Sequence, residues 1–373
     1  MQFSTVSTIK DLKSFCSKNL KDEPPFINFD FFYYLEITNC TGKHAGWVPE
    51  HIIIKENNSI IGVIPNFRKF NSYGEYVFDQ IFENAHHQLG FEYYPKYLSA
   101  IPFTPVTRKR FFYNTEKNIP QEIYGKLIKF LKKKQVSSFH INFINKKISD
   151  ELKKNNFLQR IGIQYHWKNR CYKEFDDFLS DLKARKKKNI LRERNYLKKK
   201  KIKISIKTGK KIEANDIFLL FECYKNTINK KWSYKYLSLK FFKKLFLSSL
   251  LEKMVLILAF DDQGFVGCSL HFIGKGTLYG RYWGCLREIP FLHFELCYYQ
   301  AIEYAIQNKL KIVEAGAQGE HKISRGYLPN LTFSNHWFSH SFLNEKIKTF
   351  LKMEEKKIKE NLDFLKKHSP FSD

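Results

Sequence analysis

The sequence predicts an α/β protein with mixed sheets that is built from a duplicated unit, and two observations carry this prediction. Strand–turn–strand patterns rich in β-branched residues occur at residues 47–67 and again at 255–273. A Tyr-Gly-x-Tyr motif follows each of them, at residues 73–76 and 279–282. Since a helix and a short strand are expected after each motif, the order of elements repeats, as it does after an internal duplication.

Hydrophobic periodicity places the individual elements along the chain. The first unit is expected to hold helices at residues 28–36, 78–89, 121–134 and 148–155 and strands at 47–55, 60–67, 94–100, 139–144 and 162–167. In the second unit, a helix opens at Phe175, strands lie at 255–260, 265–273, 278–285 and 311–317, and a long helix lies at 292–308. In this alignment the helix at 78–89 corresponds to 292–308, and the strand at 94–100 corresponds to 311–317. We therefore expect one domain over residues 1–168, a second over 169–343 and a charged terminal helix over 344–373.

Composition is typical of a soluble globular protein. Of the 373 residues, 43% are hydrophobic, which is enough to form a sizeable core. The N-terminus has no basic region followed by an apolar run, and no apolar stretch approaches the roughly 20 residues that span a bilayer. The seven cysteines never form a Cys-x-x-Cys pair, which argues against a disulfide framework and a structural zinc site. We therefore expect a cytoplasmic protein with reduced thiols and no bound metal.

The formal net charge of +27 suggests acidic partners such as phosphates, nucleotides, tRNA or anionic lipid. A general preference for Lys explains the global excess equally well, so local clustering is more informative. Residues 183–203 hold twelve Lys or Arg and a single acid, Glu193. One interpretation is a solvated helix face. The other, which the local density favours, is a ridge that holds the phosphates of a donor through Arg185, Lys186, Lys187, Lys188 and Arg192.

Several well-known catalytic and nucleotide-binding motifs are missing. The chain has no P-loop, no Gly-x-Gly-x-x-Gly after a strand, no His-Glu-x-x-His and no Gly-x-Ser-x-Gly. These absences argue against P-loop ATP binding, a dinucleotide site, a metalloprotease site of this type and a nucleophile elbow.

The richest cluster of titratable groups lies in the polar loop at residues 316–325, after the strand that carries Glu314. Glu314, Glu320 and His321 are the candidate catalytic residues, because a carboxylate beside an imidazole can deprotonate an incoming amine near neutral pH. Lys322 and Arg325 are suited to hold a phosphate or to stabilise an oxyanion. The alternative is a polar turn with a salt bridge.

Stretches at residues 72–79, 94–96, 101–107, 164–167, 185–190, 278–285, 290–300 and 314–328 are similar, in order, to one known family. The chain resembles the FemAB-like group of N-acyltransferases in the GNAT superfamily, a family also labelled peptidoglycan biosynthesis/recognition. The resemblance implies tandem GNAT-like domains of FemABX type. It also implies transfer of an acyl or aminoacyl group from an activated donor to an amine acceptor.

The resemblance leaves the donor open. Related Fem-type enzymes use aminoacyl-tRNA and a peptidoglycan precursor, whereas typical GNAT enzymes use acyl-CoA. Typical GNAT members carry an Arg/Gln-x-x-Gly-x-Gly/Ala loop that grips the CoA pyrophosphate, and residues 159–164 fail its last position. We expect either acyl-CoA or aminoacyl-tRNA as a co-substrate, and no tightly bound cofactor.

The matching stretches supply the candidate substrate contacts. In the second unit these are Tyr279, Arg281, Tyr282, Trp283, His293, Glu295, Gln318, Lys322 and Arg325. In and next to the first unit they are Tyr73, Glu75, Tyr76, Thr104 and His166. The first unit lacks a Glu-His-Lys loop, so the chemistry is assigned to the second.

Two other functions fit the same residues. The chain is alternatively a non-catalytic binding module that kept the acyltransferase fold and recognises RNA or a cell-wall precursor. A weaker alternative is attachment to an anionic membrane through the basic helix.

Overall fold

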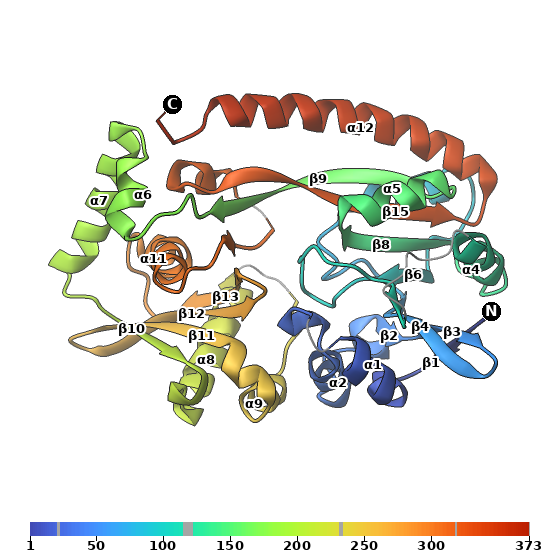
Figure 1. Cartoon of the computed structure of the whole chain (residues 1–373), viewed down its shortest axis with the longest axis horizontal. Coiled ribbons are helices and arrows are strands. Elements are labelled where there is room, and N and C mark those ends of the chain that lie inside the picture. Colours follow the sequence, from blue (N-terminus) through green and yellow to red (C-terminus); the bar gives the residue numbers. More distant parts are fainter. Residues whose placement is uncertain (21–22, 115–121, 231–233, 318, 373) are drawn as a thin grey trace. The chain divides into compact units, whose positions relative to one another are not determined.

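The computed structural model describes residues 1–20, 23–114, 122–230, 234–317 and 319–372 and has a mixed α/β fold (Figure 1). The chain divides into two compact units, each of which is discontinuous in sequence. Unit 1 comprises Met1–Asp22, Phe26–Ile163 and Leu331–Asn361, and unit 2 comprises Glu23–Pro25, Gln164–Asn330 and Leu362–Asp373. These boundaries differ from the sequence-order domains at 1–168 and 169–343, because residues 331–361 belong to unit 1.

Unit 1 is built on two sheets. Its strands are β1 (Gln2–Val6), β2 (Trp47–Pro49), β3 (His51–Glu56), β4 (Ser59–Ile64), β5 (Phe67–Lys69), β6 (Lys96–Ser99), β7 (Phe112–Tyr113) and β8 (Ser138–Ile144). Its helical elements are η1 (Ile9–Leu12), α1 (Lys13–Asn19), η2 (Pro25–Ile27, which begins in unit 2), α2 (Phe29–Ile37), η3 (Lys43–Ala45), α3 (Gln80–His87), α4 (Glu122–Lys132) and α5 (Lys146–Lys154).

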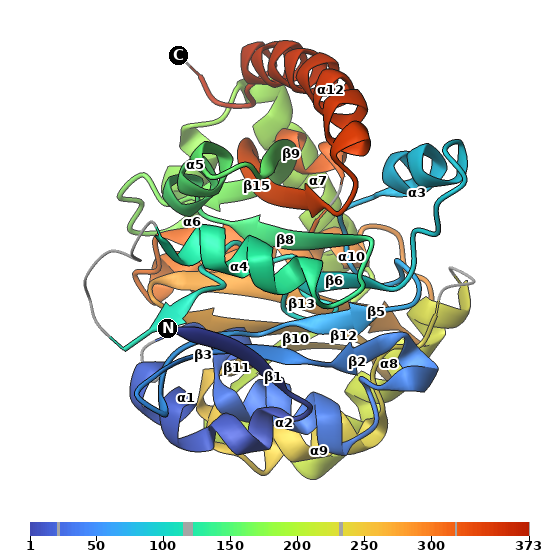
Figure 2. The same ribbon diagram turned by 90° about the vertical axis from the view of Figure 1, so that its right-hand side faces the viewer.

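One sheet of unit 1 has the order β1-β3-β4-β7, and the other runs β2-β5-β6-β8-β15, where β15 is Leu328–Phe338. The predicted hairpin is confirmed: β3 and β4 pair across Asn57 and Asn58, whose φ angles of 47° and 62° suit a two-residue hairpin turn. The core forms where α4 packs on β8 (Figure 2), with Leu127, Phe139 and Trp337 in one buried cluster.

Unit 2 contains a sheet of the order β10-β11-β12-β13-β14-β9. Its strands are β10 (Lys203–Thr208), β11 (Met254–Asp261), β12 (Gly264–Gly274), β13 (Thr277–Cys285) and β14 (Ile312–Glu314), with the end of β9 (Leu158–Lys168). Its helical elements are α6 (Phe175–Ser180), α7 (Ala184–Lys199), η4 (Gly209–Lys211), α8 (Ala214–Lys230), α9 (Leu239–Phe246), η5 (Ser249–Lys253), α10 (Leu292–Phe294), η6 (Glu295–Tyr299), α11 (Gln300–Gln307) and η7 (Glu320–Arg325).

Helices cover both faces of the unit 2 sheet, with α8 and α11 on opposite sides of it (Figure 1). Residues 255–259 of β11 are all fully buried, and they form the continuous apolar run that a strand covered on both faces requires. The predicted strands and the hairpin at 255–273 are therefore confirmed. The predicted long helix at 292–308 is present as α10, a π-helical turn η6 and α11 in direct succession.

Two long strands pass from one unit into the other along the chain. β9 begins in unit 1, and its last residues, from His166 to Lys168, pair with β14 of unit 2. β15 begins in unit 2, and its residues from Phe333 to Phe338 pair with β8 of unit 1. The terminal helix α12 (Ser341–Lys367) also starts in unit 1, where it packs its apolar stripe on Phe338.

The two units share a topology, but the predicted alignment between them is wrong beyond the hairpins. In each unit one strand pairs in parallel with the next across a helix: β6 with β8 across α4, and β13 with β14 across α10–α11. β6 therefore corresponds to β13, and not to β14 as the shared Tyr-Gly-x-Tyr letters suggested. The letters mislead because residues 279–282 lie in a strand, whereas residues 73–76 form a loop whose Tyr76 has a φ of 59°.

Candidate functional site

The candidate site of unit 2 lies where two parallel strands separate. β13 pairs with β14 only from Thr277 to Tyr279, and β14 ends at Glu314 while β13 continues to Cys285. A bulge falls at this point, because Leu270 of β12 is opposite Tyr282 and the next residue is opposite Gly280. Bulges of this kind redirect side chains and often accompany functional sites.

The polar loop after β14 is in fact a short 3-10 helix, η7, bounded by two glycines. Gly319 before it has a φ of 116°, and Gly326 after it has a φ of 90°. A Cβ atom at Gly319 would lie 2.5 Å from Cε1 of His321, and one at Gly326 would lie 2.7 Å from the ring of Phe178. Both positions therefore need glycine, and together they fix where η7 presents its side chains.

His321 is paired with a tyrosine. Its Nε2 atom lies 3.0 Å from Oη of Tyr298, which belongs to η6. Partial burial and then the charges of Arg325 and Lys322 lower the pKa of His321 below its usual range. Burial raises the pKa of Tyr298, so its phenol stays protonated. A neutral imidazole and a neutral phenol in contact form a pair that can pass a proton.

Lys322 is the buried cation of the site. Its side chain is 2% exposed, and Nζ donates one hydrogen bond, of 3.3 Å, to the carbonyl of Gly316. Burial lowers the pKa of Lys322 to about 8, against a smaller opposing effect of the Cys297 thiol. Within the described ranges, no carboxylate lies within ion-pair distance of this ammonium group. A desolvated cation with one partner is suited to meet negative charge on a ligand.

Arg325, by contrast, already has its partners. It donates to Glu193 Oε1 at 2.8 Å and to Oη of Tyr299 at 3.0 Å, and its guanidinium lies 3.5 Å from the ring centre of Phe294. Tyr299 donates a short hydrogen bond to the same Glu193 carboxylate. Arg325 therefore ties η7 to α7 and is not available to hold a phosphate as expected. Its role is to position η7.

Glu193 was seen in the sequence only as the one acid of a basic run. It is buried together with Ile190 and Leu197 on one face of α7. The spacing of these three residues, with intervals of three and four, was the signal that placed Glu193 on the buried face. Tyr298 and Tyr299 had no comparable signal, because aromatic residues are frequent along this chain.

A row of rings connects β13 with η7. Trp283 of β13 lies 4.9 Å from His293, His293 lies 5.2 Å from Tyr298, and His293 lies 6.3 Å from His321, all between ring centres. The structure thus brings together Trp283, His293, His321, Lys322 and Arg325, as expected. The π-helical turn η6 supplies Tyr298 to this group, and such turns recur at functional sites.

Other predicted residues of unit 2 lie in its interior. Glu314 is opposite Tyr279 on one side and His166 on the other, and all three are buried in adjacent strands. Glu295 is buried and pairs with Arg194 at 3.1 Å. These four residues support the sheet and the helix below the site, and burial keeps them from broad contact with a substrate.

The remaining predicted residues of unit 2 are more accessible. Glu320 opens η7 and is exposed. Arg281 and Tyr282 lie at the bulge of β13, and the ring of Tyr282 packs on those of Tyr224 and Phe242. Gln318 falls outside the described residues.

The predicted residues of unit 1 fall into two groups. Tyr73 and Tyr76 are exposed on the loop before α3. Glu75 is buried in an ion cluster, and Thr104 is buried with its hydroxyl donating to the Pro102 carbonyl at 3.0 Å. Tyr73 and Tyr76 can therefore contact a ligand, whereas Glu75 and Thr104 hold their own segments in place.

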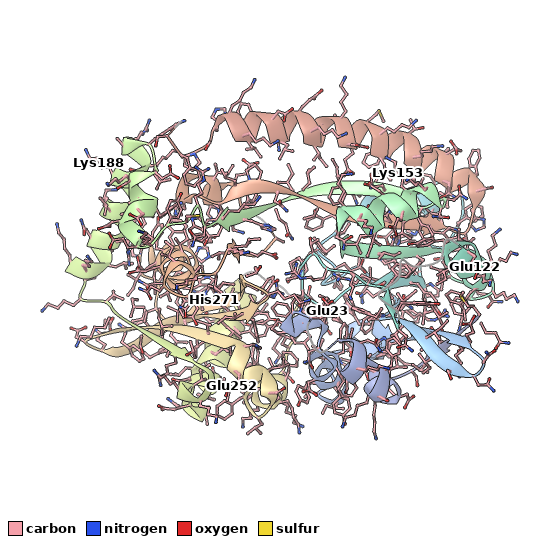
Figure 3. All side chains as sticks on the ribbon, viewed as in Figure 1. Glu23, Glu122, Lys153, Lys188, Glu252 and His271 are labelled. Carbon is pink, nitrogen blue, oxygen red and sulfur yellow. The ribbon has the colours of Figure 1, made fainter. Side chains whose placement is uncertain are left out.

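The predicted phosphate-binding residues lie on the basic helix α7, from which Lys188 projects (Figure 3). A surface groove of about 770 Å³ runs along this helix and is lined by Lys187, Lys188, Leu191, Arg192, Asn195, Tyr196, Lys198 and Lys199, with Ala184 at one end. Arg185 and Lys186 lie on the same helix outside this lining. The basic face is thus solvent-facing, and Glu193 and Leu197 occupy the buried one.

Two searches of the described part of the chain gave negative results. No group of three His, Cys, Asp or Glu side chains is arranged to hold a metal ion. None of the helices in the described segments is both long and apolar enough to cross a membrane.

The chain matches one protein-family model over residues 8–373, that of the FemAB-like proteins, described as peptidoglycan biosynthesis/recognition. No curated protein sequence shows significant similarity to it. Among solved structures, FemX is similar with 12% sequence identity and a TM-score of 0.52, over 93% of this chain and 100% of FemX.

Two further structures are comparable. A conserved protein of unknown function from Bacteroides thetaiotaomicron has 10% identity and a TM-score of 0.53, over 90% of this chain and 99% of that one. L-PGS from Bacillus licheniformis has 7% identity and a TM-score of 0.50, over 85% and 93%. At these identities the likeness concerns the fold, which is the FemABX-type arrangement of GNAT-like units.

Proposed function

The chain belongs to the FemAB-like family of peptidoglycan biosynthesis and recognition, and from this premise we propose that it is an N-acyltransferase. It would move an acyl or aminoacyl group from an activated donor to an amine acceptor. The observation that carries the proposal is η7, which puts the buried Lys322 ammonium and the His321–Tyr298 pair side by side where β13 and β14 separate.

Acyl transfer to an amine has three electrostatic requirements, and this cluster offers a group for each. The amine must lose a proton as its nitrogen bonds to the donor carbonyl carbon, and neutral His321 is placed to accept it. The carbonyl oxygen gains negative charge, which the Lys322 ammonium would stabilise. The bond from the carbonyl carbon to the leaving oxygen or sulfur then breaks, and the leaving atom takes a proton from imidazolium through the Tyr298 hydroxyl.

The carboxylates have supporting places in this proposal. Glu320 is exposed at the start of η7 and would orient the acceptor amine. Glu314 is buried between β13 and β9 and would act on the field of the site without touching the reacting atoms. The ion pair of Arg325 with Glu193 keeps η7 in register with α7.

Replacing His321 by Gln and Lys322 by Met tests the proposal. Wild type and variants are incubated with a panel of acyl-CoAs and aminoacyl-tRNAs and with hydroxylamine as a small amine, and products are detected by mass spectrometry. We expect each variant to lose at least about 100-fold in rate. The exposed residues His87 and Lys253 give the matched controls His87→Gln and Lys253→Met, which should keep full activity. Undiminished transfer by His321→Gln would refute its role as the base.

The pH profile gives a second readout. The rate should rise with pH through the lowered pKa of His321, since only the neutral imidazole accepts a proton. It should fall above a pH of about 8, where Lys322 loses its charge. Lys322→Arg keeps a charge at that pH, so in this variant the falling limb should disappear. An identical profile in the two proteins would count against Lys322 as the oxyanion partner.

The donor's phosphates are assigned to the groove along α7. Both acyl-CoA and aminoacyl-tRNA carry phosphates, and the groove presents Lys187, Lys188 and Arg192 without a carboxylate in its lining. Changing these three residues to Glu should weaken donor binding and reduce the slope of log K against log salt by roughly one for each lost phosphate contact. The exposed pair Lys132 and Lys133 of unit 1, changed to Glu, is the control. Equal slopes in both variants would contradict the assignment.

The same basic groove favours one alternative, a binding module for RNA without chemistry. This alternative holds if RNA binds through α7 with a steep salt dependence while wild-type protein consumes no donor from the panel.

A further inference from the structure

The loop at residues 70–79 of unit 1 presents aromatic rings to solvent. It connects β5 with α3, and its side chains alternate between two environments. Phe70, Tyr73, Tyr76 and Phe78 are exposed, Tyr73 by 61% and Phe78 by 60% of their surface. Glu75 and Asp79 point inward and are buried. A run of exposed rings on one short loop is unusual, because isolated exposed apolar residues are the normal case.

The two carboxylates meet two lysines that are completely buried. Lys69 of β5 and Lys96 of β6 are directly opposite each other in the sheet. Lys96 Nζ lies 2.9 Å from Glu75 and forms a shorter contact with Asp79, and Lys69 Nζ lies 3.7 Å from Glu75. Like charges in opposing positions repel, so the strands need the loop's carboxylates for compensation. The charges of the cluster balance as two positive and two negative.

Further contacts fix the beginning of the loop. Lys96 donates to Oγ of Ser72 at 2.7 Å, and the ring nitrogen of Trp47 donates to the Tyr73 carbonyl at 2.8 Å. The Arg160 guanidinium donates to the Phe78 carbonyl at 2.5 Å. The loop is thus attached from beneath along its length, and its outward rings are held on a rigid base.

Tyr76 is strained within this loop. Its φ of 59° lies in the left-handed region, which is unfavourable for a residue with a large side chain. Nothing in the buried cluster requires the Tyr76 side chain, since it is exposed. Strain that the surrounding contacts impose on an exposed side chain is typical of sites where that side chain binds something.

We propose that the rings of Tyr73, Tyr76 and Phe78 form a platform that binds the uncharged face of a sugar ring. Sugar rings present C–H groups that pack on aromatic faces and hydroxyl groups that bond to tyrosine hydroxyls. The exposed rings carry no charge in a protein with a net charge of +27, and the charges beneath them are buried and balanced. The platform therefore suits a neutral saccharide and offers no site for a phosphate.

This inference rests on the proposed function in one respect, since the glycan would belong to the amine acceptor. The description of the family as peptidoglycan biosynthesis/recognition gives the ligand class a second support. The platform would select acceptors that carry a glycan, while the chemistry takes place in unit 2.

Binding of chitotetraose, a neutral sugar oligomer, tests the platform. We expect the variants Tyr73→Ala, Tyr76→Gly and Phe78→Ala each to weaken binding by about tenfold, measured by calorimetry or saturation-transfer NMR. Phe218 of α8 is 49% exposed, and Phe218→Ala is the matched control that should bind as wild type does. The proposal is overturned if wild type does not bind the oligomer, or if the platform variants bind it as tightly as the control.

Tyr76→Gly separates binding from folding. Glycine adopts a φ of 59° without strain, so this variant should unfold at the same temperature as wild type or higher. Loss of binding with unchanged stability cannot come from a purely structural role. If binding and stability fall together in this variant, the loop is structural and the platform is refuted.

Transfer to hydroxylamine distinguishes this inference from the proposed function. Hydroxylamine has no sugar, so the platform variants should transfer to it as fast as wild type and should lose rate only with a glycan-bearing amine. If no protein transfers to hydroxylamine, the proposed function fails, and chitotetraose binding still decides the platform.

Discussion

Lys322 keeps an ammonium group inside unit 2 with a single hydrogen-bond partner, and this arrangement has a cost in stability. Burial lowers its pKa from 10.5 to about 8, so the folded protein binds the proton less tightly than the unfolded chain does. Below pH 8 both states are protonated, and the folded state carries the full cost of the buried charge. Between pH 8 and 10.5 only the unfolded state keeps the proton, so the stability of wild type rises with pH over this interval.

Lys322→Met should therefore stabilise the protein at pH 7. At about 1.4 kcal/mol per pKa unit, the difference corresponds to about 3 kcal/mol at pH 7, and it should shrink above pH 8 and vanish near pH 10.5. Urea unfolding at pH 7, 9 and 10 measures this, with the exposed Lys253→Met as control. A gain that did not depend on pH would show that better packing, and not lost charge, is responsible. The same variant should lose transfer activity, as is common when a functional site is relaxed.

Glu193 and Arg325 form a buried pair whose two halves depend on each other. Glu193→Ala leaves the Arg325 guanidinium buried without its counter-charge, and we expect a loss of about 3–5 kcal/mol in the free energy of unfolding. Glu288 pairs with Lys230 at 2.7 Å on the surface, so Glu288→Ala is the matched control and should leave the urea midpoint unchanged. Similar midpoints for the two variants would mean that the Arg325 side chain finds solvent when Glu193 is lost.

At the scale of the element, η7 depends on backbone conformations that its sequence shows only indirectly. The sequence located the loop, its titratable residues and its glycines. It did not show that the loop is helical, that Lys322 is buried beside an exposed His321, or that Arg325 is used up by Glu193. These features depend on contacts with α7 and η6, which lie many residues away in sequence, and no local pattern specifies them.

Two glycines beside η7 offer a matched pair of variants. Gly316 and Gly319 both have positive φ angles, of 81° and 116°. A Cβ at Gly316 would meet nothing within 4 Å, whereas one at Gly319 would lie 2.5 Å from the His321 ring. Both Ala variants should lose about 1 kcal/mol of stability or more from backbone strain. Only Gly319→Ala should also lose transfer activity, because it displaces His321. Equal activity of the two variants, measured with the hydroxylamine assay, would argue against His321 as the base.

At the scale of the whole molecule, local pattern predicted most strands but not how they are shared. Buried strands such as β11 are continuous apolar runs, and the β3–β4 hairpin has its Asn-Asn turn, so both were evident. The pairing of β15 with β8 joins residues nearly 200 positions apart, for example His336 with His140, and periodicity carries no information on such partners. The same is true of Lys69 and Lys96, which the sequence analysis passed over because two completely buried lysines are rare.

The sharing of β15 makes unit 1 dependent on the far end of the chain. Residues 331–361 supply Trp337 to the core cluster around Leu127 and Phe139 and supply the strand that pairs with β8. A fragment of residues 1–168 lacks these residues and would expose both the edge of β8 and the apolar surface that Trp337 and Phe338 cover. We therefore expect this fragment to lack cooperative unfolding and to bind a dye specific for exposed apolar surface. A peptide of residues 328–361 added in trans should restore a cooperative transition, followed by circular dichroism, whereas the same peptide with Trp337→Ala and Phe338→Ala should not. Cooperative folding of residues 1–168 alone would show that the sequence-order domain is self-sufficient and that β15 only adds to it.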